Sequence, residues 1–231
     1  MFPYKRTWDG EGIGWKRISK RQRNYMAYRL SQTIEEAVQA FKKLPGIGEK
    51  TAMRLVLATL EQSSDDVEQF AQALHNLKTK LRKCNVCHSF ADDELCSICT
   101  DNKRDKMTLC VVESIRDIVA IESTQTYHGV YHVLGGLISP MQGIGPEDLT
   151  FSSLFHRIKN DQVKEVIMAL NPNMEGDTTT FYISRQLDLE SISLTSLSRG
   201  ISFGGELEFA DAMTLSRSLA ARQPFDRYLS G

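Results

Sequence analysis

Residues 44–55 read LPGIGEKTAMRL, and this stretch decides how the first part of the chain folds. Glycine tolerates positive φ angles and lets another backbone approach closely. A Pro-Gly-Ile-Gly turn between two helical patterns therefore ends one helix and leaves backbone N–H groups open at the start of the next. Those groups, together with the positive end of the helix dipole, can bind a phosphate oxygen. We expect Ile47 to pack inward and fix the turn.

Two basic residues follow the glycines on the second helix. Lys50 and Arg54 are four residues apart, so they share one face of that helix and can follow a nucleic-acid backbone without reading bases. The segment resembles a helix-hairpin-helix motif, and its candidate DNA-binding residues are Gly46, Gly48, Lys50 and Arg54. A plain helix–helix turn is the competing interpretation. The chain contains no G-x-x-x-x-G-K-[ST] phosphate loop, which disfavours a P-loop ATPase.

Apolar residues repeat at three- and four-residue spacing on both sides of this hairpin. The pattern predicts helices over residues 31–41, 49–60 and 67–81. We expect the third helix to bury an apolar stripe of four side chains: Phe70, Leu74, Leu77 and Leu81. Residues 31–82 are therefore expected to form a small helical domain.

The first 30 residues differ from the rest, because they are rich in Lys, Arg, Gly and aromatic residues and show no clear period. We expect a poorly ordered extension here, and a basic arm that touches nucleic acid is the alternative. No secretory signal and no apolar run of about 18 residues is present, so we expect a cytoplasmic protein. The formal net charge of the 231 residues is -1, so any nucleic-acid site has to be a local patch.

Four of the five cysteines form two C-x-x-C pairs that are separated by eight residues: Cys84, Cys87, Cys96 and Cys99. Four thiolates can close a tetrahedral site around Zn²⁺ with no open position, so we predict one structural zinc ion per chain. Metal binding would stabilise a loop that has almost no apolar core of its own. A redox pair or two disulfides are the alternatives. We expect His88 to face solvent and Cys110 to be a buried apolar residue.

Strands and helices alternate in the second half of the chain. Short apolar runs predict strands at 109–113, 127–134, 163–170 and 192–198. Helical patterns lie between them at 114–122, 149–159 and 178–187. This alternation predicts a parallel α/β sheet. A last helix is expected over residues 206–222.

Acidic residues follow two of the predicted strands, at the edge where ligands gather in a parallel sheet. Glu113 ends the first strand, and we expect Glu175 and Asp177 in the loop after the third. Such carboxylates could bind Mg²⁺ for phosphoryl chemistry. The strand-end positions Asn171 and Asn173 are amides, however, which carry no charge and bind Mg²⁺ more weakly. The enzymatic interpretation therefore loses ground.

Taken in order, these motifs resemble the RecR family of bacterial recombination mediators, from about residue 31 to the C-terminus. The stretches that carry the resemblance are LPGIGEKTAMRL (44–55), the four-cysteine loop (84–99), LCVVE (109–113), YHVLGGLISPMQGIGPEDL (131–149), ALNPNMEGDTTTFYI (169–183) and SRGISFGGELEFADAMTLSRSLAAR (198–222). Each stretch alone is shared with other families, but their order is specific.

The resemblance implies an α+β protein of several modules. These are a helix-hairpin-helix domain (31–82), a four-cysteine zinc finger (83–104), a Toprim domain with a central parallel sheet (105–197) and a C-terminal helical tail for oligomerisation (198–231). Catalytic Toprim domains carry a strand-end Asp-x-Asp. RecR proteins share the Asn-x-Asn departure seen here, which implies a non-catalytic protein.

The resemblance also implies a function. RecR-like proteins form ring-shaped tetramers that act with RecO, and in many bacteria RecF, to load RecA onto single-stranded DNA coated by single-strand-binding protein. Glu113, Glu175 and Asp177 would offer RecO an acidic surface, with solvated loop charge as the alternative. The segment carrying Glu206, Glu208 and Asp211 resembles the nucleotide-site-like tail of the family. The competing functions are a Toprim nuclease or nucleotidyl transferase, and a zinc-stabilised adaptor without DNA contact.

Overall fold

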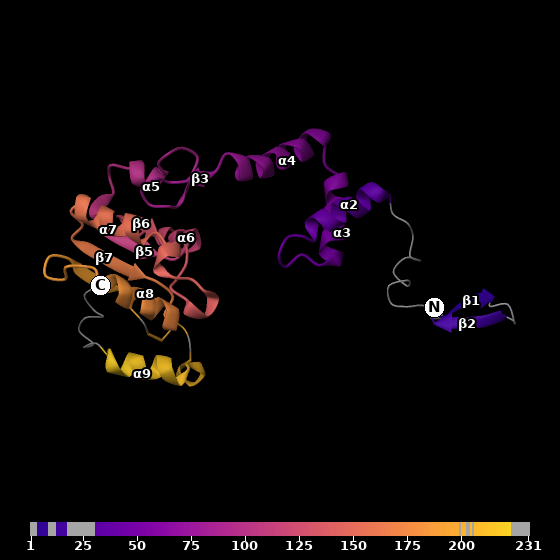
Figure 1. The fold of residues 1–231 in the computed structure, drawn as a ribbon. Coiled ribbons are helices and arrows are strands. Elements are labelled where there is room, and N and C mark those ends of the chain that lie inside the picture. Colours follow the sequence, from indigo (N-terminus) through magenta and orange to yellow (C-terminus); the bar gives the residue numbers. More distant parts are fainter. Residues whose placement is uncertain are drawn as a thin grey trace. The chain divides into compact units, whose positions relative to one another are not determined.

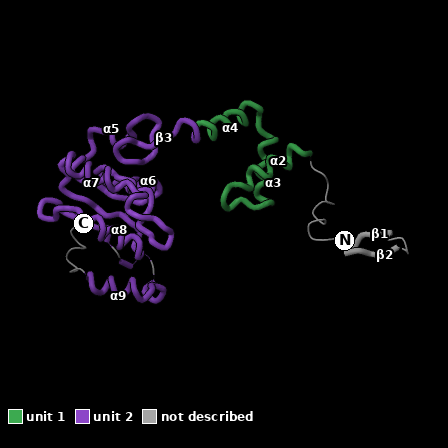
Figure 2. Tube along the Cα trace, in the orientation of Figure 1, with its two compact units in different colours: residues 1–76 green, residues 77–231 purple. Residues whose placement is uncertain are grey.

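The computed structural model describes residues 31–198, 200–201, 204 and 206–222, together with the backbone of two short strands near the N-terminus. These strands, β1 (Tyr4–Trp8) and β2 (Ile13–Arg17), pair in antiparallel fashion within the extension that we expected to be poorly ordered. The rest of that extension lies outside the described residues. The chain divides into two compact units, residues 1–76 and 77–231, which are described separately (Figure 2).

Helices α2 (Gln32–Phe41) and α3 (Glu49–Leu60) form the centre of the first unit (Figure 1). Their small core consists of three buried side chains: Val38, Ala52 and Val56. Ile47, in the turn between the helices, is partly buried against this core, as predicted. The apolar periodicity of the sequence thus places both helices, and the turn side chain closes their contact.

Helix α4 (Ser64–Thr79) differs from the prediction in what it buries. None of its side chains is buried, and the exposed fractions of Phe70, Leu74 and Leu77 are 50%, 53% and 62%. The expected burial of this stripe is therefore wrong for the described chain. Helices α2 and α3 bury their apolar faces against each other, and no described element covers the stripe of α4.

The second unit begins with the cysteine-rich segment, which has little regular structure. Strands β3 (Arg82–Lys83) and β4 (Phe90–Ala91) pair in antiparallel fashion, and a single turn of helix, α5 (Ser97–Thr100), follows. Its buried apolar cluster consists of Ala91 and three of the cysteines, with Cys99 packed at their edge. This segment therefore has almost no apolar core apart from its sulfur atoms.

A four-stranded sheet forms the centre of the second unit. Its strands are β5 (Asp105–Val112), β6 (Gly129–Val133), β7 (Glu165–Ala169) and β8 (Ser193–Ser196). The order is β6-β5-β7-β8 and every pairing is parallel, as predicted. Strand β6 is thus one edge of the sheet.

Helices cover both faces of this sheet. Alternate residues of a strand point to opposite faces, so Leu109 and Val111 of β5 enter one core and Cys110 and Val112 the other. Helices α7 (Phe151–Asn160) and α8 (Met174–Ser184) pack on the first face, and α6 (Ile115–Glu122) packs on the second. Cys110 is buried among apolar side chains, as expected from the sequence.

The C-terminal stretch is not one helix, as the sequence suggested. A short 3-10 turn, η4 (Leu207–Phe209), precedes helix α9 (Ala212–Ala220). Asp211 separates the two, because its side chain accepts hydrogen bonds from the N–H groups of Met213 (3.0 Å) and Thr214 (2.9 Å) and starts the new helix. In the described part of the chain, no helix combines the length and the apolar character needed to cross a membrane.

Candidate functional site

The glycine hairpin joins α2 to α3 through backbone geometry that requires glycine at one position. Gly46 has a φ of +79°, a left-handed conformation that residues with a side chain rarely adopt. Gly48 is the N-cap of α3, with an extended backbone and no side chain to cap the helix. The first N–H groups of α3 therefore remain open at the helix terminus, as an anion site requires.

Basic side chains surround this turn. Lys50 and Arg54 are both exposed on α3, one turn apart, as predicted. Lys42, at the end of α2, forms an ion pair with Glu49 across the turn, whereas Lys43 is exposed beside it. We did not select Lys43 from the sequence, although the two lysines directly before LPGIG were the available signal. Between residues 42 and 54 the chain carries four basic side chains and one acidic one.

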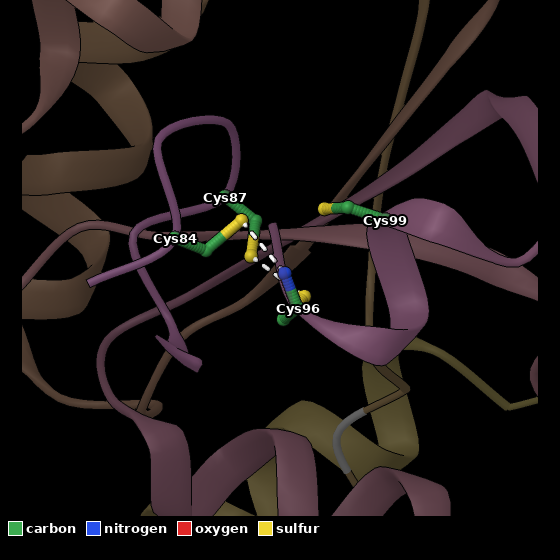
Figure 3. Close-up of side chains that lie close together, drawn as sticks. All are labelled: Cys84, Cys87, Cys96 and Cys99. Carbon is green, nitrogen blue, oxygen red and sulfur yellow. Dashed lines mark hydrogen bonds between the residues drawn. The ribbon is translucent and has the colours of Figure 1, made fainter. Parts of the chain in front are cut away.

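The four paired cysteines converge on one point (Figure 3). Their sulfur atoms all lie within 4.8 Å of one another, and the sulfurs of Cys87 and Cys96 are 3.5 Å apart. A tetrahedral site with Zn–S bonds of about 2.3 Å places neighbouring sulfurs about 3.8 Å apart. The arrangement therefore fits one zinc ion held by four thiolates, and with no ligand position left for water the ion is structural.

The protonation of the thiols is set by their surroundings. Burial raises the pKa of the Cys84 thiol, but hydrogen bonds from three backbone N–H groups outweigh burial and bring that pKa to about 7. The neighbouring Cys99 thiol and burial together raise the pKa of Cys87, and burial raises that of Cys96. Zinc binds thiolates, so loading the site releases protons and becomes weaker as the pH falls.

The zinc loop is docked on the edge strand of the sheet. The Val133 N–H of β6 donates to the carbonyl oxygen of Cys87 over 2.8 Å. His88 follows with a φ of 60°, and its Nε2 lies 2.7 Å from the Ser153 hydroxyl of α7. The expectation that His88 faces solvent is therefore wrong, because the ring is half-buried and packs edge-on against His132 at a centroid distance of 5.1 Å.

His132 lies in the middle of this contact and is fully buried. Its Nε2 lies 3.0 Å from the Thr150 hydroxyl, and its Nδ1 has no hydrogen-bond partner within the described residues. Burial, with the positive charge of His88 and Arg157 nearby, lowers the pKa of His132 to about 3. The ring is therefore neutral at physiological pH and acts as a packing element between the zinc loop and the sheet.

The carboxyl edge of the sheet holds the amides that we singled out from the sequence. The Asn171 side chain, just after β7, donates to the Glu113 carboxylate over 2.8 Å. Asn173 is the N-cap of α8, where its side-chain oxygen accepts from the Gly176 N–H at 2.8 Å. Helix α8 therefore begins four residues earlier than expected, and Glu175 and Asp177 lie in its first turn instead of in a loop.

The three predicted carboxylates of this edge have separate partners. Glu113 is bonded to Asn171, Glu175 accepts from the Ser139 hydroxyl, and Asp177 forms a 3.6 Å ion pair with Arg217 of α9. Within the described ranges, the four cysteines are the one group of three or more His, Cys, Asp or Glu side chains close enough to share a metal ion. The arrangement thus gives no support to a Mg²⁺ centre at this edge.

These modules define a class of protein: a helix-hairpin-helix domain followed by a four-cysteine zinc finger and a Toprim sheet. Family comparisons match the same segments. Residues 34–78 match the RecR helix-hairpin-helix, 81–101 the four-cysteine zinc finger domain of RecR, 107–198 the Toprim domain and 200–223 the RecR C-terminal region.

Relatives of similar length match across most of the chain, and each is named recombination protein RecR. The Phocaeicola vulgatus protein is 55% identical over 195 residues, which is 84% of this chain and 95% of the relative. The Cytophaga hutchinsonii protein is 52% identical over 197 residues (85% and 96%), and the Staphylococcus aureus protein is 49% identical over 191 (83% and 96%). The chain belongs to the RecR family of recombination proteins, with a role in DNA repair and recombination.

Proposed function

We propose that the protein is a non-catalytic recombination mediator of the cytoplasm. It binds DNA without regard to sequence and acts with RecO, and with RecF, to help load RecA onto single-stranded DNA coated by single-strand-binding protein. The observation that carries the proposal is the glycine hairpin: an open helix N-terminus flanked by exposed Lys50 and Arg54, in a chain of the RecR family.

The hairpin is suited to contact a phosphate backbone. The open N–H groups of α3 bind an anion at the positive end of the helix dipole, and the basic side chains extend the contact to neighbouring phosphates. A few phosphate contacts give weak, salt-sensitive binding. Several hairpins in one assembly raise the effective concentration and hence the affinity.

The exposed stripe of α4 supports such an assembly. Phe70, Leu74 and Leu77 lie on one side of the helix at four- and three-residue spacing, and each is at least half exposed. An apolar stripe of this kind is typical of a protein–protein interface. We infer that a second copy of the chain covers it and that the protein is a homotetramer arranged as a ring.

The Toprim edge supports a binding role over catalysis. The Glu113 carboxylate is held by the Asn171 amide, whereas metal-dependent phosphoryl transfer needs carboxylates that share a cation. We expect the double variant Asn171→Asp/Asn173→Asp to bind DNA as the wild type does and to show no turnover of DNA or nucleotides with Mg²⁺. Mg²⁺-dependent cleavage or synthesis by the wild-type protein, lost in Glu113→Gln, would favour the Toprim enzyme instead.

Glu113, Glu175 and Asp177 form the proposed acidic surface for RecO. All three are half-buried on the edge opposite the N-terminal ends of the strands. A basic partner would have to compete with Asn171, Ser139 and Arg217 for these carboxylates.

The mediator function is tested by the rate at which RecA coats single-stranded DNA that single-strand-binding protein already covers, followed through the DNA-dependent ATPase of RecA. Addition of the protein together with RecO is expected to shorten the lag several-fold, and neither protein alone should do so. The Lys50→Glu/Arg54→Glu variant is expected to be inactive. An unchanged lag with both wild-type proteins present would contradict the proposal.

A further inference from the structure

The tip of the zinc loop carries three consecutive carboxylates, Asp92, Asp93 and Glu94. All three are exposed, and none forms a side-chain hydrogen bond or an ion pair within the described part of the chain. This separates them from Glu113 and Glu175, whose carboxylates are already bonded to neighbouring side chains. The tip therefore presents negative charge that no neighbour neutralises.

Apolar side chains flank this charge. Phe90 precedes the carboxylates with an exposed fraction of 50%, and Leu95 follows them with 40%. Together with the carboxylates they line a hollow of about 760 Å³, which Arg82, Ser97 and Thr100 complete. Two large apolar side chains beside a block of charge are unusual on a surface that serves only for solvation.

The tip is held rigid by the metal site beneath it. The Asn85 N–H donates to the Glu94 carbonyl at 2.9 Å, and the Cys84 N–H donates to the Ser89 carbonyl at 2.7 Å. Leu95 directly precedes the ligand Cys96. The tip is thus pre-organised once zinc is bound, so a partner would lose little free energy in ordering it.

We propose that residues 90–95 are a docking surface for a basic segment of a partner protein, with an apolar side chain of that segment seated between Phe90 and Leu95. The negative charge selects a basic partner and repels the phosphates of DNA. This inference rests on the proposed function, which supplies such a partner in RecO. A protein that itself binds DNA carries a basic surface of this kind.

The test measures the affinity of purified RecO from the same organism for the zinc-loaded protein at low and moderate salt. The tip is neutralised without loss of size in Asp92→Asn/Asp93→Asn/Glu94→Gln. A matched control, Glu35→Gln/Glu61→Gln/Glu68→Gln, removes three exposed charges from the helical unit. Zinc content and DNA binding are measured for each protein, which shows whether each variant is folded.

We expect the tip variant to bind RecO at least tenfold more weakly, to retain zinc and DNA binding, and to lose most of the salt dependence. A second variant, Phe90→Ser/Leu95→Ser, should weaken RecO binding with its salt dependence preserved. The control should bind RecO as the wild type does.

Undiminished RecO binding by the tip variant overturns the proposal, as does a loss seen equally in the control. Loss in Glu113→Gln/Glu175→Gln with the tip variant unaffected places RecO at the Toprim edge and overturns it as well. A wild-type protein that binds DNA but not RecO overturns the docking surface and leaves the DNA role standing. Failure of the wild type to bind either one overturns the proposed function itself.

Discussion

Gly46 is the residue on which the hairpin geometry depends most. Its φ of +79° lies in the left-handed region, although the space around a Cβ at this position is open. The constraint is therefore backbone conformation and not packing. The turn aims the N-terminus of α3 outward, so a change in its backbone alters both stability and the presentation of the N–H groups.

Gly46→Ala is expected to lower the free energy of unfolding of the helical unit by about 1–2 kcal/mol, which is the cost of a left-handed conformation for a residue with a Cβ. Gly46→Asn should lose less, since asparagine tolerates this conformation. Chemical denaturation followed by circular dichroism measures both variants. Equal losses in the two would show that the φ angle is not the constraint.

His132 makes stability depend on pH. The unfolded pKa is 6.5 and the folded pKa is about 3, so the unfolded chain binds the proton first and stability falls as the pH drops below 6.5. Between pH 7 and pH 5 the lost free energy of unfolding is about 2 kcal/mol. Zinc release also contributes to acid sensitivity.

The His132→Gln variant separates these two effects, because it keeps the zinc ligands and removes the titrating ring. Urea unfolding at pH 7 and pH 5, with zinc in excess, should show a smaller loss for the variant than for the wild type. An identical pH dependence in the two proteins would exclude His132 as the source.

At the scale of elements, the zinc loop is the module that depends most on its ligands. Its buried apolar cluster is almost entirely cysteine, so the metal supplies the stabilisation that an apolar core provides elsewhere. The loop in turn covers the edge strand β6 through the Val133–Cys87 hydrogen bond. Loss of zinc should therefore expose a sheet edge and favour aggregation.

Cys87→Ala is expected to abolish stoichiometric zinc and to lower the thermal stability of the Toprim unit. Cys110 is a matched control, because it is a buried cysteine in the sheet core outside the zinc site. Cys110→Ala should keep one zinc ion per chain. Metal analysis and thermal melts measure both effects, and full zinc content in Cys87→Ala would contradict the four-thiolate assignment.

Most elements could be predicted from the sequence, since periodicity and strand alternation depend on local residue patterns. The exceptions depend on contacts that a pattern does not encode. The apolar repeat of α4 looks the same whether a helix buries its stripe or presents it to a partner. The start of α8 at Met174 and the half-buried position of His88 follow from the Asn173 cap and from a contact with α7, respectively.

The candidate sites follow the same rule. The zinc ligands could be assigned because C-x-x-C spacing is itself the geometry of a metal knuckle. The partners of Glu113, Glu175 and Asp177 could not be assigned, because each lies far away in sequence. Asn171, which appeared only as a weak metal ligand, proves to be the hydrogen-bond donor to Glu113.

At the scale of the whole molecule, the account combines three surfaces with different tasks. The basic hairpin contacts DNA, the apolar stripe of α4 joins copies of the chain, and acidic surfaces of the zinc loop and the Toprim edge receive partners. The DNA contact is the central claim, because the mediator role depends on it.

The most direct test compares DNA binding by the wild type with that of Lys50→Glu/Arg54→Glu, at low and moderate salt. Lys159→Glu/Lys164→Glu makes the same charge change at exposed positions of the Toprim unit, and light scattering confirms that all three proteins assemble alike. The account predicts salt-dependent binding by the wild type and the control, and binding weakened roughly tenfold or more in the hairpin variant. Equal binding by all three proteins would contradict it, and no binding by any would favour an adaptor without DNA contact.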